Sequence, residues 1–210
     1  MTMFKNHDLV DKSTLEKLYK SGKSMTEISQ KYKCSVHKVV YWMRKYRIAR
    51  RTHSESSYLK HNPNGDPFRI RPRLTREELF LFGLGVGIFW GEGSKSPEVS
   101  SLRIANTDPD LIRTFLKFLT DLFGLDKKRF SYSIICFNDT DPEVCRNYWS
   151  EQLKISPDRF GKITIIPKQG KGTYKRKSQF GVCIVQGNNV KLKRFVFDQI
   201  DKIRDKYKPR

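Results

Sequence analysis

Residues 79–94 read LFLFGLGVGIFWGEGS and form the most hydrophobic run of the 210-residue chain. Gly83, Gly87 and Gly91 recur in it every four residues, a spacing that places all three on one face of a helix. Each glycine costs about 1 kcal/mol of helix stability relative to alanine, so a compensating contact is needed. Close approach of a second helix supplies such a contact. We therefore expect a helix that packs its glycine face on a partner helix and carries Glu92 at its end.

A buried core helix with a polar end is the alternative interpretation of this run. The run is too short, and too often interrupted by glycine, to cross a bilayer. Glu-Gly-Ser follows the glycine stripe directly at residues 92–94, which favours a functional helix end. We expect Gly93 to serve as the helix C-cap.

Residues 85–93, GVGIFWGEG, resemble the motif of the LAGLIDADG homing endonuclease family. The resemblance implies that Gly87 and Gly91 are small packing positions. It also implies that Glu92 is the catalytic, metal-binding carboxylate and that the backbone carbonyl of Gly91 lies beside the metal. The sequence departs from the family pattern at Gly85, where the family prefers leucine, and at Trp90, where it often has aspartate.

The chain contains one copy of this motif, whereas double-strand cleavage needs two acidic residues. In the family, two motif helices pack together and bring both carboxylates to the metal ions. The resemblance therefore implies a homodimer, with Gly83, Gly87 and Gly91 at the two-fold contact. It implies Mg²⁺ or another divalent cation as the cofactor, and Lys168 as a second catalytic residue that assists the water network.

The chain is strongly basic, with a net charge of +20 and a pI near 9.9. Residues 1–74 carry 17 Lys/Arg against 6 Asp/Glu, and residues 75–210 carry 25 against 16. A polyanion is the natural partner of such a chain, and double-stranded DNA is the partner that we expect. A merely soluble basic protein is the alternative. No basic amphipathic anchor is present, so we expect no membrane partner.

The cysteines and histidines exclude several kinds of site. No two of the four cysteines form a CxxC pair, so neither a zinc site nor a disulfide framework is expected. All four histidines fall in the first 61 residues, which argues against a Ser/His/Asp site in the larger domain. The first ten residues are polar and do not form a signal peptide. We expect a cytoplasmic, nucleoid-associated protein.

Residues 1–46 are expected to form a helix-turn-helix domain after a loose leader at residues 1–12. The first predicted helix spans residues 14–20 and is capped by Ser13. The second spans residues 24–32 and starts with a capping box of Ser24 and Glu27. The third spans residues 36–46 and is capped by Ser35. A tight turn precedes the third helix, as in the helix-turn-helix plan. The expected shared core consists of Leu15, Leu18, Tyr19, Ile28, Val39 and Met43.

Residues 35–48, SVHKVVYWMRKYRI, resemble the recognition helix of resolvase-type and homeodomain-like helix-turn-helix domains. Val39 and Met43 are expected to face the core. Side chains on the other side are available to DNA bases and phosphates. The predicted DNA-binding residues are Ser35, His37, Lys38, Tyr41, Arg44 and Lys45. A small helical domain that binds protein is the alternative.

Residues 47–74 are expected to form a basic linker with turn chemistry and little periodicity. Arginines alternate at its end, and Arg71 and Arg73 are predicted DNA-binding residues. An arginine-rich tether lies along a DNA backbone or in a minor groove. A solvated linker is the alternative.

Residues 75–210 are expected to form an α+β domain. A capping box at Thr75 and Glu78 starts the glycine-striped helix, and Asp108-Pro109 and Asp141-Pro142 start two more helices. A hairpin is expected after the glycine-striped helix, with residues 101–105 as its second strand. The later expected strands are residues 132–137, 163–166 and 180–185, and the expected last helix is residues 189–206. The order is similar to that of the LAGLIDADG domain, which implies a saddle-shaped, curved antiparallel sheet with helices on one face.

A basic connector between the last two strands is predicted to contact phosphates. It contains no acidic residue, and its DNA-binding candidates beside Lys168 are Lys171, Lys175, Arg176 and Lys177. A flexible solvated loop is the alternative.

These features predict a site-specific double-stranded DNA endonuclease of the homing type. The alternative is a sequence-specific DNA-binding transcriptional regulator whose LAGLIDADG-like domain does no chemistry. The acidic Glu92 favours the nuclease, and Trp90 in place of the family's aspartate leaves the regulator open. A recombinase accessory protein is a third reading, which rests only on the resolvase-like helices.

Overall fold

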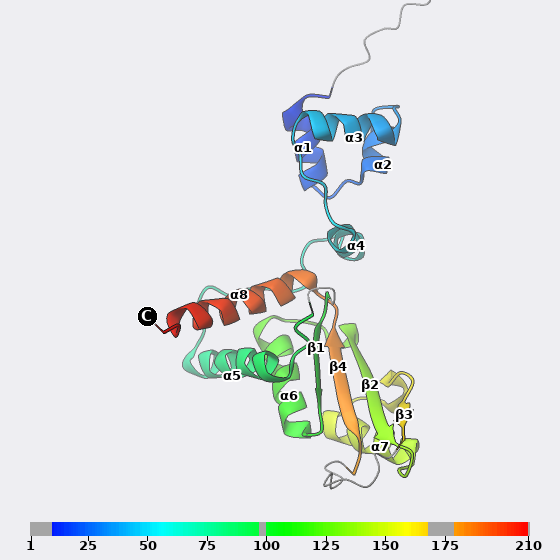
Figure 1. Ribbon diagram of the computed structural model, residues 1–210, viewed down its shortest axis with the longest axis vertical. Coiled ribbons are helices and arrows are strands. Elements are labelled where there is room, and N and C mark those ends of the chain that lie inside the picture. Colours follow the sequence, from blue (N-terminus) through cyan, green and yellow to red (C-terminus); the bar gives the residue numbers. More distant parts are fainter. Residues whose placement is uncertain (1–9, 97–99, 168–178, 210) are drawn as a thin grey trace, which may run out of the picture. The chain divides into compact units, whose positions relative to one another are not determined.

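The structure, a computed structural model, describes residues 10–96, 100–167 and 179–209 (Figure 1). The chain forms two compact units, Met1–Gly65 and Asp66–Arg210, so the boundary between them lies inside the predicted linker of residues 47–74. Helices that are both apolar enough and long enough to cross a membrane do not occur in the described part of the chain.

Three short helices share one core in the first unit. They are α1 (Lys12–Lys20), α2 (Met25–Lys31) and α3 (Val36–Lys45). The predicted core is confirmed, since Leu15, Tyr19, Ile28, Val39 and Met43 are buried and Leu18 packs against them. Val10 and Trp42 are also buried in this cluster and were not predicted.

The predicted caps of α2 and α3 are confirmed, but the cap of α1 is not. Glu27 donates its amide to Ser24 Oγ (3.1 Å) and accepts from the amide of Ser24 (2.8 Å), which is a complete capping box. Helix α1 is capped by Asp11, whose carboxylate accepts from the amide of Thr14 (2.9 Å). The prediction of Ser13 as a cap was wrong because the aspartate three residues before Thr14 already satisfies that amide.

Part of the predicted linker is helical. Helix α4 (His53–His61) starts from a capping box in which Thr52 and Glu55 satisfy each other's amides. The expectation of turn chemistry alone was therefore wrong over these residues. The missed signal is the Thr-x-x-Glu pattern at Thr52, which has the same form as the two capping boxes that were recognised.

The second unit has the predicted order of elements, except that the described residues contain no first strand of the hairpin expected after the glycine-striped helix. It consists of α5 (Arg76–Glu92), β1 (Leu102–Asn106), α6 (Pro109–Lys117), β2 (Phe130–Phe137), α7 (Pro142–Leu153), β3 (Thr164–Ile166), β4 (Val182–Gly187) and α8 (Val190–Lys206). A π-helical turn, η1 (Phe118–Leu122), extends α6, and two 3-10 turns, η2 (Lys127–Arg129) and η3 (Pro157–Arg159), lie in the connections. The fold class α+β is confirmed.

The sheet has four strands in the order β1-β4-β2-β3 (Figure 1). Strand β4 pairs antiparallel with both β1 and β2, whereas β3 pairs parallel with β2. The expectation of an antiparallel sheet was wrong at this edge. Helix α7 lies between β2 and β3 in the chain, and a helical crossover is the connection that returns a strand in the parallel direction.

Helices pack on one face of the sheet through a single core. Alternate residues of β2 are buried, and they join Leu102 and Ile104 of β1 in a cluster with Phe115 of α6 and Trp149 of α7. Trp149 is fully buried and donates its indole N–H to the carbonyl of Phe180 (2.9 Å), which fixes α7 to the start of β4.

Polar side chains form a row on the other face of the sheet. Arg103 of β1 is in register with Gln186 of β4, and Gln186 is in register with Ser131 of β2. All three are partly or fully exposed. This row crosses the three strands that are paired antiparallel.

Candidate nucleic-acid interface

The exposed side of α3 carries all of the side chains that were predicted to bind DNA in the first unit. These residues, Ser35, His37, Lys38, Tyr41, Arg44 and Lys45, are exposed. Val39, Trp42 and Met43 face the core from the opposite side of the helix. The burial pattern therefore agrees with the predicted orientation of the helix, and contact with DNA stays a prediction.

The charge around this helix has a single sign. Residues 28–54 contain eight Lys/Arg and no Asp/Glu. The nearest acidic residues along the chain are Glu27 and Glu55, and each is used in a capping box. A surface of this kind attracts a polyanion over a distance of about one Debye length, or roughly 8 Å at physiological salt.

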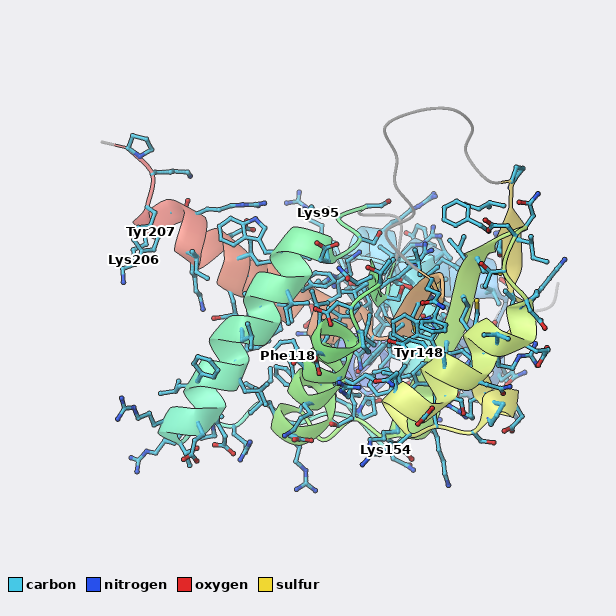
Figure 2. The ribbon with its side chains drawn as sticks, turned by 90° about the horizontal axis from the view of Figure 1, so that it is seen from below. Lys95, Phe118, Tyr148, Lys154, Lys206 and Tyr207 are labelled. Atoms are coloured by element: carbon cyan, nitrogen blue, oxygen red, sulfur yellow. The ribbon has the colours of Figure 1, made fainter. Side chains whose placement is uncertain are left out.

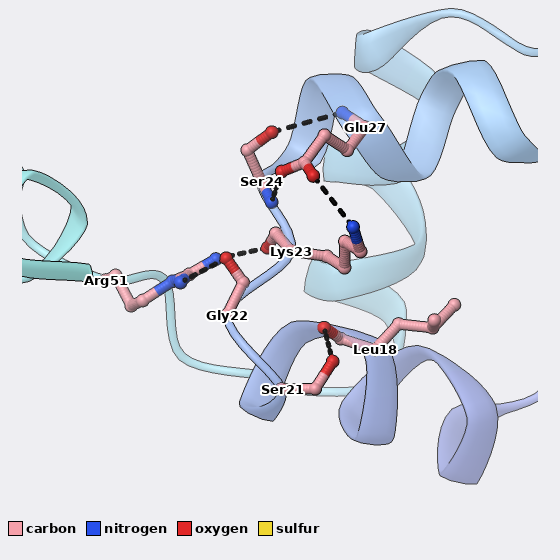
Figure 3. Close-up of polar contacts among 7 residues, drawn as sticks. All are labelled: Leu18, Ser21, Gly22, Lys23, Ser24, Glu27 and Arg51. Atoms are coloured by element: carbon pink, nitrogen blue, oxygen red, sulfur yellow. Dashed lines mark hydrogen bonds and ion pairs between the residues drawn. The ribbon is translucent and has the colours of Figure 1, made fainter. Parts of the chain in front are cut away.

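Arg51 belongs to the basic linker by sequence, but its side chain serves the fold of the first unit (Figure 3). Its guanidinium donates to the carbonyl of Gly22 (3.2 Å) and to that of Lys23, and it lies 4.0 Å from the ring centroid of Tyr19. Its amide donates to the hydroxyl of Tyr19 (2.9 Å). The residues directly after α3 are thus fastened to the turn between α1 and α2.

Arg71 is also committed to an internal contact. Its guanidinium forms an ion pair with Glu78 (2.6 Å) and donates to the carbonyl of Asp121 (3.4 Å). The amide of Thr75 and then this arginine lower the pKa of the Glu78 carboxyl. Arg73, the other arginine predicted to bind DNA in this segment, is exposed. Of the two, Arg73 is the better placed to reach a ligand.

The glycine stripe of α5 faces outward. Gly83, Gly87 and Gly91 are exposed, and no described atom lies within 4 Å of the position that a Cβ would take at any of them. Phe80 and Leu84 share this helix face and are 73% and 42% exposed. The predicted partner helix is therefore not supplied by the described residues of this chain.

A different glycine, Gly85, makes the close helix contact within the chain. A Cβ at Gly85 would collide with the ring of Phe118. Phe118 is a fully buried residue of the π-helical turn and is labelled in Figure 2. Gly85 is also one of the two positions where the sequence departs from the LAGLIDADG pattern. The departure has a packing reason, because any larger side chain would collide with the Phe118 ring.

Glu92 is the last residue of α5 and is exposed. Gly93 caps the helix as expected, but with an extended backbone (φ −75°, ψ 149°) rather than a left-handed one. It forms a bridge with Ile104, and the amide of Ser94 donates to the carbonyl of Arg103 (2.9 Å). The end of α5 is therefore joined directly to β1.

The two residues that the resemblance assigns to a metal are adjacent at this helix end. The Glu92 carboxylate and the Gly91 carbonyl are hard oxygen donors of the kind that Mg²⁺ prefers. Lys95 lies just beyond the end of α5 (Figure 2). Its Nζ is 3.5 Å from the Gly91 carbonyl oxygen. The described residues contain no group of three or more His, Cys, Asp or Glu able to hold a metal ion. One chain thus offers the right donor type but few donors.

A buried lysine holds the segment that follows Glu92. Lys193, in the first turn of α8, is only 5% exposed, and its ammonium donates to the carbonyl of Ser96 (2.8 Å). Burial lowers the pKa of Lys193. The same ammonium lies over the ring of Phe197, which packs edge-on against Phe89 of α5. Sequence reasoning missed this residue, because a lysine in a helix is usually solvated.

The basic residues of the predicted connector are not among those that the structure describes. These residues are Lys168, Lys171, Lys175, Arg176 and Lys177.

Comparison with known proteins gave no match: no family model, no curated protein and no solved structure is similar to this chain. The resemblance to the LAGLIDADG family therefore rests on one motif and on the order of elements.

Proposed function

We propose that this protein is a site-specific double-stranded DNA endonuclease of the homing type that acts as a homodimer. The observation that carries the proposal is the surface of α5, which presents a glycine stripe to solvent and ends in the exposed carboxylate of Glu92. A DNA target implies a cytoplasmic, nucleoid-associated location.

The homodimer is supported by the energetics of α5. Three exposed glycines weaken the helix by about 1 kcal/mol each relative to alanine, and the described chain offers them no contact in return. Phe80 and Leu84 add exposed apolar surface to the same face. A second α5, packed across a two-fold axis on Gly83, Gly87 and Gly91, would cover both the glycines and these side chains.

DNA binding is supported by both units. The basic face of α3 supplies side chains that suit base edges and phosphates. In the second unit, the row of Arg103, Gln186 and Ser131 offers donors and acceptors of the types that read base pairs in the major groove. We assign this face to the concave side of a LAGLIDADG-like saddle. Arg73 and the basic connector, including Lys171, Lys175, Arg176 and Lys177, would add phosphate contacts.

Cleavage would depend on residues at the end of α5. In the dimer, Glu92 and the Gly91 carbonyl of each chain would hold a divalent cation such as Mg²⁺ between them. The chemistry that such a cation supplies is activation of a water molecule and stabilisation of the leaving oxygen. Lys95 keeps a positive charge near the Gly91 carbonyl, where it can also face a phosphate. Lys168 remains a proposed catalytic residue.

A DNA-binding regulator is the second candidate, and one observation favours it. Within the described residues Glu92 does not belong to a group of three or more His, Cys, Asp or Glu that could hold a metal ion. Trp90 stands where the family often has aspartate, and its ring lies 5.6 Å from the guanidinium of Arg204. A chain of this kind could keep the dimer and the DNA surface without cutting.

Cleavage of a randomised duplex DNA library in Mg²⁺ decides between the two. The parent chain and Glu92→Gln are incubated with the library, and the ends produced are sequenced. The endonuclease proposal predicts a recurrent cut site for the parent and none for the variant. Binding of a shared sequence by both proteins, with no cutting by either, would establish the regulator.

A further inference from the structure

Lys33 precedes α3 in a conformation that is unfavourable for its residue type. Its φ is 46°, in the left-handed region. The amide of Cys34 donates back to the carbonyl of Ser29 (2.9 Å), so the end of α2 requires this turn. Glycine is the residue that adopts it without steric cost, and glycine does occupy the corresponding position after α1, at Gly22.

Arg47 follows α3 in the same conformation. Its φ is 55°, and the amide of Ile48 donates to the carbonyl of Met43 (2.9 Å). Both ends of α3 are therefore bounded by a basic residue at a position that favours glycine. Strain of this kind persists where the side chain has a use that outweighs it.

The folded unit itself gives neither side chain a use. Lys33 and Arg47 are exposed, and within the described residues neither side chain forms an ion pair or a hydrogen bond. Arg51, four residues after Arg47, shows the opposite behaviour, since its guanidinium is held by two carbonyls and an aromatic ring. Arg51 thus serves the fold, whereas the side chains of Lys33 and Arg47 are free to act outward.

The positions of the two residues suggest what they contact. A helix of ten residues is about 15 Å long, slightly more than the roughly 12 Å width of the major groove of B-DNA. Residues at both ends of such a helix lie near the sugar-phosphate walls when its exposed face is in the groove. We propose that Lys33 and Arg47 are phosphate contacts that bracket α3 and fix its position on DNA. This inference rests on the proposed DNA binding and names two residues that it did not include.

The test uses the full chain and the variants Lys33→Gly and Arg47→Gly. Binding to a random-sequence duplex of about 40 base pairs is measured over a series of salt concentrations. Each variant should bind about fivefold more weakly at 150 mM salt, and its slope of log K against log salt should fall by about 0.9. In the same variants, amide exchange of α1 to α3 should slow by roughly two- to fivefold, because glycine relieves the strain.

Charge-matched controls separate a specific contact from a general loss of charge. Lys20→Ala removes one positive charge from a side chain that is 79% exposed on α1, and its salt slope should match that of the parent. Lys33→Arg and Arg47→Lys keep the charge and should retain the parent slope.

Three results would overturn the inference. Parent-like affinity and slope in both glycine variants would overturn it while leaving the proposed function intact. Weaker binding together with faster amide exchange would show that the variants lose structure rather than contacts, and would also overturn it. Failure of the parent to bind duplex DNA would overturn the inference and the proposed function together.

Discussion

At the scale of single residues, Gly85 and Gly87 have opposite surroundings although they lie two positions apart in α5. A methyl group at Gly85 would collide with the Phe118 ring, whereas one at Gly87 would enter open space. We expect Gly85→Ala to lower the free energy of unfolding by about 1–3 kcal/mol. Gly87→Ala should raise it by up to about 1 kcal/mol.

Urea denaturation of the two variants, at a concentration where the parent sediments as a monomer, checks this pair. Equal effects of the two substitutions would show that α5 is not oriented as described. The pair is informative because both replacements are identical in chemistry and lie on the same helix.

Glu27 gives a residue-scale prediction for pH. The amide of Ser24 and the ammonium of Lys23 lower the pKa of Glu27 to about 2. Because its pKa is lower in the folded state, its stabilising effect is complete above the ordinary value near 4.5 and is lost as the pH falls toward 2. Amide exchange of α2 should therefore accelerate over this window in the parent. Glu27→Gln should show a smaller change, and an identical pH profile would refute the assignment.

Some of the residues in the candidate site could be predicted from sequence and others could not. The outward orientation of His37, Tyr41 and Arg44 follows from the apolar period of α3, and the structure agrees with it. The contact of Gly85 with Phe118 could not be predicted, because it joins residues 33 positions apart through a π-helical turn. The structural contacts of Arg51 could not be predicted for the same reason, because its hydrogen-bond partners lie near residue 22, far from it in the chain.

At the scale of elements, the segment between α3 and α4 is fixed by Arg51. Removing its guanidinium leaves two carbonyls without a charged donor and uncovers the ring of Tyr19. We expect Arg51→Ala to destabilise the first unit by about 2 kcal/mol. Amide exchange of α1 and α2 in the full chain measures the effect.

Arg50→Ala is the matched control for Arg51, because it removes the same group from an exposed neighbour. It should leave the exchange of α1 and α2 unchanged. Equal acceleration in both variants would mean that net charge, not the contacts of Arg51, sets the stability.

Most elements with a signal in the sequence were predicted, and two such signals were overlooked. Asp108 and Asp141 cap their helices as expected, each accepting from an amide two residues on (2.8 Å). Helix α4 carried a local signal that was overlooked. The direction of β3 also carried a signal that was overlooked, because a helix was predicted between β2 and β3, and a helical crossover returns a strand in the parallel direction.

At the scale of the whole molecule, the proposal requires two chains. We expect the parent to form a dimer in sedimentation experiments and Gly87→Ile to remain a monomer, because isoleucine would separate two closely packed α5 helices. Glu151→Ile places the same side chain at an exposed position of α7 and should leave the dimer intact. A monomeric parent, both free and on DNA, would contradict the proposed assembly.

Apart from the first strand of the expected hairpin, the order of helices and strands could be predicted from capping and periodicity along the chain, and so could the α+β class. The boundary between the two units was harder to predict from the sequence. The turn residues near position 65 and the basic run near position 50 are both features of linkers, but Ile48 and Arg51 pack onto the first unit. These contacts place the basic run inside the first unit, and the boundary falls at the turn residues, between Gly65 and Asp66.

Selection from a randomised duplex library tests the central claim most directly. The full chain is allowed to bind the library in the absence of divalent cations, and the retained sequences are determined. The account predicts one enriched sequence with two similar, inverted halves, shared by the parent and by Glu92→Gln, because a two-fold dimer binds both halves alike. Retained DNA with no enriched sequence would contradict it.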